Sequence, residues 1–493
     1  MGIIKRQASR NTLINFIGAG FGALTRLSMP AILTDMQIGF ITMLDAVSGL
    51  FVTIFSLGFN QILARLFPRF RDEERGHNGF LLFGVYISLV GITLGSLGYF
   101  LFKDAFTPND PFYQNYEGFV LLIFPLIFFR IIFKNLDGYA SMLMNSVVGT
   151  LLEGLVTKVI FFLAVLAVAL ELLNYDTLIL IFVISLCIPG VIITAYSFIK
   201  TPVILKPSRE FFEPQTKKDI LHFIGFGVLL GASNSIIFYV DSLMVNKLVS
   251  LEALGIYSTY FFAARILAIP ARSLSKISVV IISELWKKND KEGINEIYTK
   301  SCQNQLIIAG FLLTVGVICL PSAIQFLPTE KVALYQHHLP VFLFLGLALL
   351  VELATGLNST IIGTSEKYKY NAYFNMILAV LVFALNFALI QFMSLSGAAL
   401  ATFLAMLTIN TIRWYFLKAK YGLNPFNSRF IASFFIVLTL VLVAFYTPIF
   451  FGNPTLDIIL KFFTVCIIFI IAVFGFNAAP DLKELSQKIY SKK

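Results

Sequence analysis

Three cations interrupt an apolar stretch in the second half of the chain: Arg265, Arg272 and Lys276. Their spacing puts all three on one side of a helix, because successive residues turn by about 100°. A charge inside a bilayer costs several kcal/mol on insertion scales, so each one requires a reason. Snorkelling to the interface explains Lys276, but Arg265 is far from both ends of its apolar segment. The stripe therefore predicts a cavity lining that attracts an anion, with Pro270 as a bend that opens the helix toward it.

Other apolar segments also carry ionisable residues. Arg26 is in the later half of the first segment and Asp45 is early in the second, so both lie toward the same face of the membrane. This predicts either a salt bridge between them or a role for Arg26 in the cationic cavity. Asp45, Asp241 and Glu352 are candidates for Na⁺ or proton coupling, or for structural salt bridges. Two further groupings occur in the fourth and fifth segments: Arg130 with Lys134, and Glu153 with Lys158.

The elements that hold these charges are apolar segments. Of the 493 residues, 58% are hydrophobic and 13% are charged, against about a quarter charged in soluble domains. A transmembrane helix needs about 20 apolar residues. Segments of that length fall at 11–34, 38–64, 78–102, 117–141, 144–170, 176–199, 219–247, 252–282, 299–327, 335–362, 368–393, 395–418, 429–449 and 455–478. The sequence predicts an all-α polytopic membrane protein of about fourteen helices, with its tightest turns near residues 142 and 394.

Lysine and arginine alternate between the loops. One set of alternate loops and both termini hold most of them, whereas the opposite set holds only Lys103, Lys247, Lys331 and Lys461. Cytoplasmic loops carry the excess of positive charge, so both termini are predicted to be cytoplasmic. The net charge of +10 is divided among these loops, a distribution that disfavours nucleic-acid binding.

Landmarks recur at an offset of about 216 residues. Gly39 and Gly255 open the second and eighth segments, and Pro125 and Pro340 start the fourth and tenth. This predicts two pseudo-symmetric six-helix lobes, residues 1–200 and 219–420, joined by a cytoplasmic linker at 201–218. Residues 421–493 add two helices and a basic cytoplasmic tail. Parallel repeats of this kind hold the substrate between the halves in known transporters.

Metal and covalent chemistry have little support. The four cysteines show no CxxC spacing and are read as packing residues. His337 and His338 have no carboxylate or cysteine close in sequence, which disfavours a metal site. The basic N-terminus leads into an apolar segment without a small-residue cleavage site, so a retained helix is expected. No catalytic residue, metal or cofactor is predicted beyond Na⁺ or H⁺ as coupling ions.

Three stretches carry a resemblance to a known family. They are IGFITMLDAVSGLFVTIFSLGFNQILARLFPRF at 38–70, VDSLMVNKLVSLEALGIYSTYFFAARILAIPARSLSKISVVIISELW at 240–286, and LNFALIQFMSLSGAALATFLAMLTINTIRWY at 385–415. In this order and spacing the chain resembles the polysaccharide and O-antigen repeat-unit flippases of the MATE-like multidrug/oligosaccharidyl-lipid/polysaccharide transporter superfamily. The resemblance covers nearly the whole chain.

The resemblance implies a V-shaped MATE-like bundle and export of an undecaprenyl-pyrophosphate-linked oligosaccharide, as in capsule or lipopolysaccharide synthesis. It implies the bacterial cytoplasmic membrane as location, membrane lipids as surroundings, and other polysaccharide assembly proteins as partners. It also implies cavity cations from the first, second and eighth segments. Arg26, Arg265, Arg272 and Lys276 fit the first and eighth, but the core of the second holds Asp45 and no cation.

Two alternatives stay open. A multidrug–cation antiporter of the same superfamily usually carries cationic drugs, which the eighth-segment cations would repel. A membrane-embedded polysaccharide polymerase or glycosyltransferase generally displays a sizeable polar loop or a catalytic carboxylate motif, whereas the outer loops of this chain are short. The sequence therefore favours a transporter over an enzyme.

Overall fold

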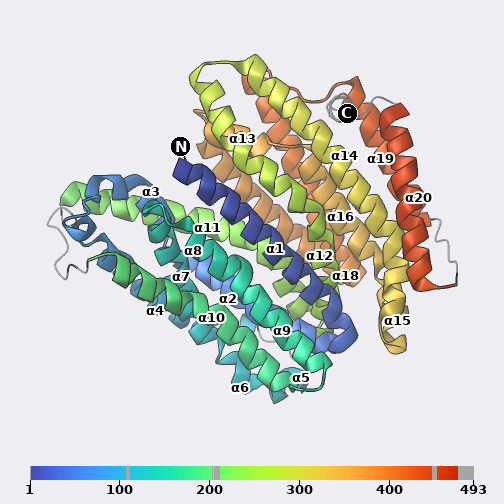
Figure 1. Ribbon diagram of the computed structural model, residues 1–493, viewed down its shortest axis with the longest axis horizontal. Coiled ribbons are helices and arrows are strands. Elements are labelled where there is room, and N and C mark those ends of the chain that lie inside the picture. The colour runs from blue at the N-terminus through green and yellow to red at the C-terminus, as the bar shows by residue number, and fades with distance from the viewer. Residues whose placement is uncertain are drawn as a thin grey trace. The chain divides into compact units, whose positions relative to one another are not determined.

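The computed structural model describes residues 2–106, 111–202, 204, 211, 213–446 and 452–475, and for some of these, including Arg272 and Lys276, only the backbone. Throughout these residues the chain is helical, without strands (Figure 1). It divides into two compact units, Met1–Thr259 and Tyr260–Lys493. The prediction of an all-α polytopic membrane protein is confirmed.

The first unit holds the elements up to the middle of α12. Their bounds are α1 (Gly2–Ile32), α2 (Asp35–Phe55), α3 (Phe59–Phe70), η1 (Gly76–Gly79), α4 (Phe80–Phe106), α5 (Pro111–Asn115), α6 (Glu117–Val120), α7 (Ile123–Met142), α8 (Ser146–Leu151), η2 (Leu152–Val156), α9 (Thr157–Ala169), α10 (Tyr175–Lys200), α11 (Pro214–Leu248) and α12 (Leu251–Arg265).

The second unit begins with the last residues of α12. Its other elements are η4 (Ile266–Ala268), α13 (Ile269–Lys287), α14 (Lys291–Ala323), η5 (Ile324–Phe326), α15 (Thr329–His337), α16 (Leu339–Ala354), α17 (Asn358–Thr364), α18 (Lys369–Tyr421), α19 (Ser428–Tyr446) and α20 (Pro454–Gly475). The predicted turns near residues 142 and 394 are present. Met144 has φ 60° after α7, and Ser394 (φ 51°) divides α18 into two helices.

Within the described residues, each apolar segment predicted from the sequence coincides with a helix or with a broken helix; residues 447–449 and 476–478 of the last two segments lie outside them. Among the described residues, eight helices are long and apolar enough to cross a membrane, and nine if the bent pair α15–α16 counts as one span. The predicted lobes, residues 1–200 and 219–420, are a division by sequence repeat and remain a prediction. Within the first unit, α11 packs against α2 and α3.

Small residues allow α2 to run close to its neighbours. A Cβ on Gly39 would lie 1.9 Å from the Leu251 carbonyl oxygen, and one on Gly255 would lie 1.9 Å from that of Asp35. At the other end, Gly58 (φ +61°) breaks α2 from α3 where the Cα of Gly227 passes. Glycine at such crossings lets helix backbones approach closely inside a membrane. These contacts hold α2 close to α11 and α12. Asp45 lies on α2 between the two crossing points.

Candidate functional site

A charged cavity of about 260 Å³ lies inside the first unit. Its lining comes from α2, α3, α7, η2, α9, α10 and α11. The polar and charged residues of that lining are Thr53, Asn60, Arg130, Lys134, Asp137, Glu153, Thr157 and Tyr239. Ligand pockets for drug-sized molecules measure roughly 300–1,000 Å³. In this conformation the cavity therefore accommodates a small charged group rather than a whole oligosaccharide.

One helix supplies most of this charge. Arg130, Lys134 and Asp137 follow one another on α7 at spacings of 4 and 3, so they lie on one helix face. The fourth charged residue of the lining is Glu153 in η2, a π-helical turn between α8 and α9. Single π-turns inside α-helices are frequent at functional sites. Glu153 interacts electrostatically with Arg130 and Lys134.

Arg130 is the most strongly held cation of the cavity. Its Nη1 donates to Asp45 Oδ1 at 3.1 Å and to Ser48 Oγ at 2.7 Å. The Tyr239 side chain interacts with the same guanidinium from α11. The side chains of Arg130 and Asp45 are 18% and 29% exposed. The pair is therefore only partly covered, and a ligand entering the cavity can reach it.

Asp45 does not depend on Arg26 alone, as the sequence suggested, because its salt bridge is with Arg130. Arg26 lies near the same region: its Nη1 is 3.5 Å from Thr42 Oγ1, one turn before Asp45 on α2. Its guanidinium carbon is 5.9 Å from the centre of the Phe161 ring. An electrostatic interaction also links Arg26 to Asp45. The carboxylate is thus shared by two arginines, of which Arg130 has the direct contact.

Asp241 has a different environment. Its side chain is buried on α11 and accepts a hydrogen bond of 2.9 Å from the Tyr257 hydroxyl on α12. Tyr257 is itself fully buried. Asp241 therefore ties two helices together inside the first unit and is not part of the cavity lining.

The eighth segment is not the straight helix that the predicted stripe assumed. After Arg265 the chain forms the 3-10 turn η4, and α13 restarts with Pro270 in its first turn. Proline is favoured at that position because its missing N–H has no helical acceptor there. The angle calculated for a straight helix does not apply across such a turn. Arg272 and Lys276 lie on the α13 backbone, and their side chains are outside the described part of the chain.

Arg265 and Glu352 belong to the second unit. The Arg265 guanidinium carbon is 5.3 Å from the Phe261 ring centre. Glu352 is exposed on α16 and interacts electrostatically with Arg413. Arg413 is buried on α18 and donates from Nη2 to Asn375 Oδ1 at 2.7 Å. The structure thus places Arg26 and Asp45 together, and Glu352 with an arginine that the sequence did not single out.

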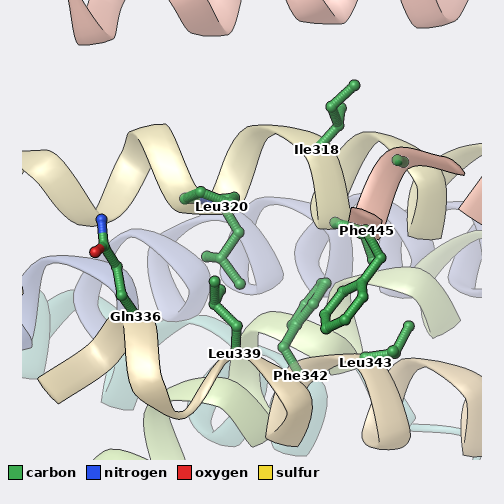
Figure 2. A pocket seen from close by; sticks show the side chains of 10 residues that line it. Ile318, Leu320, Gln336, Leu339, Phe342, Leu343 and Phe445 are labelled. Carbon is green, nitrogen blue, oxygen red and sulfur yellow. The ribbon is translucent and has the colours of Figure 1, made fainter. Parts of the chain in front are cut away.

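Another hollow, in the second unit, is largely apolar. It measures about 230 Å³ and lies between α14, α16 and α19. Figure 2 shows Leu320, Leu339 and Phe342 directed into the same space, with Gln336 at one side. It presents no ionisable group. The cavity around Arg130 is therefore the better candidate for a charged substrate.

Sequence reasoning noted Arg130, Lys134 and Glu153 but did not bring them together, and it did not mention Asp137 or Tyr239. The 4 and 3 spacing on one apolar helix was the available signal for the α7 residues. No comparable signal existed for Tyr239, because its place depends on how α11 crosses α2. A Cβ on Gly49 would lie 2.4 Å from the Tyr239 hydroxyl oxygen.

Fold and site together define a multi-pass membrane protein with a charged cavity inside its helices. The family model for the polysaccharide biosynthesis proteins matches residues 4–282, more than half of the chain, and the chain belongs to this family. No curated protein matches the sequence.

Solved structures of the same fold are membrane transporters. The lipid II flippase MurJ in an inward closed conformation superimposes with a TM-score of 0.70 at 14% identity, covering 94% of this chain and 98% of its own. An inward-facing multidrug resistance MATE family transporter of the MOP superfamily gives 0.55 at 13% identity, covering 88% and 94%.

A MOP superfamily transporter from Pyrococcus furiosus gives a TM-score of 0.51 at 13% identity, with 90% of this chain and 97% of its own covered. Identities this low establish the fold alone. The predicted MATE-like polytopic fold is confirmed, and the family is that of the polysaccharide biosynthesis proteins.

Proposed function

We propose that this protein is a flippase for an undecaprenyl-pyrophosphate-linked oligosaccharide, a repeat unit of a surface polysaccharide. The observation that carries the proposal is the Arg130–Lys134 pair at a cavity inside membrane helices. Arginine binds two phosphate oxygens through its planar fork and stays protonated where water is scarce. Lys134, one turn away, adds a second positive charge. A pyrophosphate is the part of such a lipid that needs both.

The substrate's chemistry explains why a cavity within the helices is useful. Pyrophosphate and sugars do not cross hydrocarbon unaided, whereas the polyprenyl tail is stable in it. A charged cavity inside the bundle replaces the water that the head group loses. Since the described cavity suits only a small charged group, the sugars require a wider, open conformation. Rocking of the two repeats around a central site is the usual route to such opening.

Arg26, Arg265, Arg272 and Lys276 are further candidate substrate cations in this proposal. Arg26 lies near the Arg130–Asp45 pair, so its charge can act on the head group either by direct contact or through Asp45. We place the protein in the bacterial cytoplasmic membrane, which the resemblance to repeat-unit flippases implies, with both termini in the cytoplasm, which the distribution of lysine and arginine among the loops favours. Cysteine labelling from either side of the membrane tests that orientation, and an imposed Na⁺ or proton gradient tests the coupling ion.

The decisive experiment is a flipping assay in proteoliposomes. The probe is an undecaprenyl-pyrophosphate oligosaccharide with a labelled sugar, and the readout is the sugar's accessibility to an added glycosidase. We expect the wild type to expose the label and Arg130→Ala to lose most of this activity. Glu74→Gln, which removes an exposed loop charge, serves as a matched control and should behave as wild type.

A second candidate, a multidrug–cation antiporter, has some support from the acids at this cavity, Asp137 and Glu153. The same proteoliposomes distinguish it. Transport of a lipophilic cation without any exposure of the labelled sugar would replace the flippase by the antiporter. Flipping that persists undiminished in folded Arg130→Ala would remove the cavity from the substrate path.

A further inference from the structure

Three cations at or near the cavity, Arg26, Arg130 and Lys134, have carboxylates close to them. Attractive electrostatic interactions link Arg26 to Asp45, Asp45 to Arg130, and both Arg130 and Lys134 to Glu153. The sequence predicted a cavity of cations with Asp45 as a possible salt-bridge partner of Arg26, and the structure adds Glu153 as a second carboxylate close to the cations. The reason is physical: an unpaired ion in a low-dielectric interior costs several kcal/mol, so the empty protein must supply counter-ions of its own.

Arg130 is therefore already occupied when no substrate is bound. Asp45 Oδ1 lies 3.1 Å from its Nη1, in the position that a phosphate oxygen would take. An anion can use the arginine fork fully only if the carboxylate withdraws. Binding becomes an exchange of one anion for another, in which the carboxylate must find a new partner.

The structure offers that partner in Arg26. Its Nη1 is 3.5 Å from Thr42 Oγ1 on α2, and Thr42 is three residues before Asp45. Residues at i and i+3 lie next to each other on a helix surface. Arg26 and Asp45 already interact electrostatically. A rotation of the Asp45 side chain toward Thr42 on α2 thus brings its carboxylate closer to Arg26. The carboxylate then exchanges one cation for another and does not become unpaired.

We propose that Asp45 is an exchangeable counter-ion: it holds Arg130 in the empty protein and passes to Arg26 when a pyrophosphate group takes Arg130. This rests on the proposed function for the identity of the natural anion. Asp45 then acts as a positioning residue that weakens anion binding and speeds release. When the anion leaves, the carboxylate returns to Arg130 and resets the site.

The first test measures binding of inorganic pyrophosphate to the purified full-length protein by calorimetry. Asp45→Asn removes the competing charge, so we expect the affinity to rise between about 5- and 150-fold, the usual range of coupling between two ligands. In the flipping assay the same variant should turn over more slowly, because release is impaired. Glu74→Gln is the control for a lost negative charge. Unchanged or weaker pyrophosphate binding by folded Asp45→Asn overturns the proposal.

A second variant separates exchange from direct binding. Arg26→Gln takes away the alternative partner, so pyrophosphate affinity should fall while Asp45 is present and should not change in the Asp45→Asn background. An equal loss in both backgrounds would make Arg26 a direct ligand and refute the exchange. If Asp45 had a purely structural role, Arg26→Gln would likewise change pyrophosphate affinity by the same factor in the wild type and in Asp45→Asn.

Should Asp45→Asn be unstable alone, its melting temperature supplies the readout. Pyrophosphate would replace the missing carboxylate and therefore stabilise the variant more than the wild type; equal stabilisation would count against exchange. The binding and flipping results together distinguish a failure of this proposal from a failure of the proposed function. Tighter pyrophosphate binding by the variant, with no flipping of labelled lipid by the wild type, would keep the counter-ion and reject the substrate.

Discussion

Two carboxylate–cation pairs, one in each unit, differ in how much of them a ligand can reach. In the second unit, Lys461 Nζ lies 2.7 Å from Asp457 Oδ2, and the two side chains are 2% and 1% exposed. Ser322 on α14 donates to the same carboxylate oxygen and accepts from Lys461 at 2.9 Å. In the first unit, the side chains of Arg130 and Asp45 are 18% and 29% exposed, and Arg130 lines a cavity.

The difference indicates separate roles. Asp457 and Ser322 belong to the lining of a further hollow of about 320 Å³ in the second unit, but the two charges are almost fully covered. We therefore expect the pair, through Ser322, to hold α20 to α14. The pair in the first unit is partly exposed, so Asp45 has a competitor for Arg130 whenever an anion enters the cavity. Coverage, more than distance, therefore distinguishes a structural ion pair from an exchangeable one in this protein. The predictions below test that distinction, beginning with the largest effect.

Lys461→Met should be the most destabilising change. It leaves Asp457 as an uncompensated buried charge, which costs about 3–5 kcal/mol, whereas replacing both partners by apolar residues is often neutral. We expect a large fall in the thermal midpoint of the purified protein, and recovery in Asp457→Leu/Lys461→Met. A single variant as stable as the wild type would show that the pair is not structural.

Arg130→Ala should show the opposite pattern. Its pair is partly exposed, and Asp45 keeps Arg26 as a second cation, so the loss of stability should be smaller than that of Lys461→Met, while flipping of labelled lipid falls by about tenfold or more. Arg130→Lys keeps the charge without the bidentate fork and should recover part of the activity. The thermal midpoint and the flipping rate are measured on the same preparation. A large fall in stability with normal flipping would reverse the comparison.

The sequence predicted the helices well because apolar length is a local property. Segments at 38–64 and 252–282 were read as single spans, and the chain indeed continues through both, although Gly58 and η4 break them. The breaks depend on how helices cross, which hydropathy does not contain. The paired glycines Gly39 and Gly255 were seen as landmarks of a repeat, but their contact with neighbouring backbones needed the structure.

The charges were harder to assign than the helices. Arg26 and Asp45 were brought near each other correctly, yet the direct partner of Asp45 is Arg130, 85 residues away. Lys461 was counted with the outer loops, but it is a buried residue of α20. The partner of Asp45 comes from another helix, and Lys461 is buried where a loop position was predicted. Residue spacing alone shows neither.

Gly49→Ala should reduce activity through Tyr239. A Cβ at position 49 would lie 2.4 Å from the Tyr239 hydroxyl oxygen and from its ring carbon Cζ, so the ring must move away from the cavity wall. Overpacking of this kind costs typically 1–3 kcal/mol. We expect a several-fold loss of flipping, and relief of the packing strain in Gly49→Ala/Tyr239→Ala. If the single variant melts and flips as the wild type does, the wall is more adaptable than the structure indicates.

Tyr257→Phe should affect stability and leave transport nearly unchanged. The tyrosine hydroxyl donates to Asp241 inside a covered contact between α11 and α12, so its removal costs a buried carboxylate one hydrogen bond, about 1–3 kcal/mol. This contact resembles the Lys461 pair in coverage although it lies in the same unit as Arg130. Thermal unfolding is compared with the flipping rate of the folded fraction. A selective loss of flipping would bring Asp241 into the transport path.

The smallest effect is expected from filling the apolar hollow of the second unit. Leu339 points into that space (Figure 2), and Leu339→Trp would occupy part of its 230 Å³. Because this hollow has no ionisable lining, a pyrophosphate head group gains nothing there, and flipping should change by less than about twofold, about 0.4 kcal/mol in the barrier. The control is Leu339→Met, which nearly conserves volume. A strong loss with tryptophan and none with methionine would show that the substrate, through its lipid part, also uses the second unit.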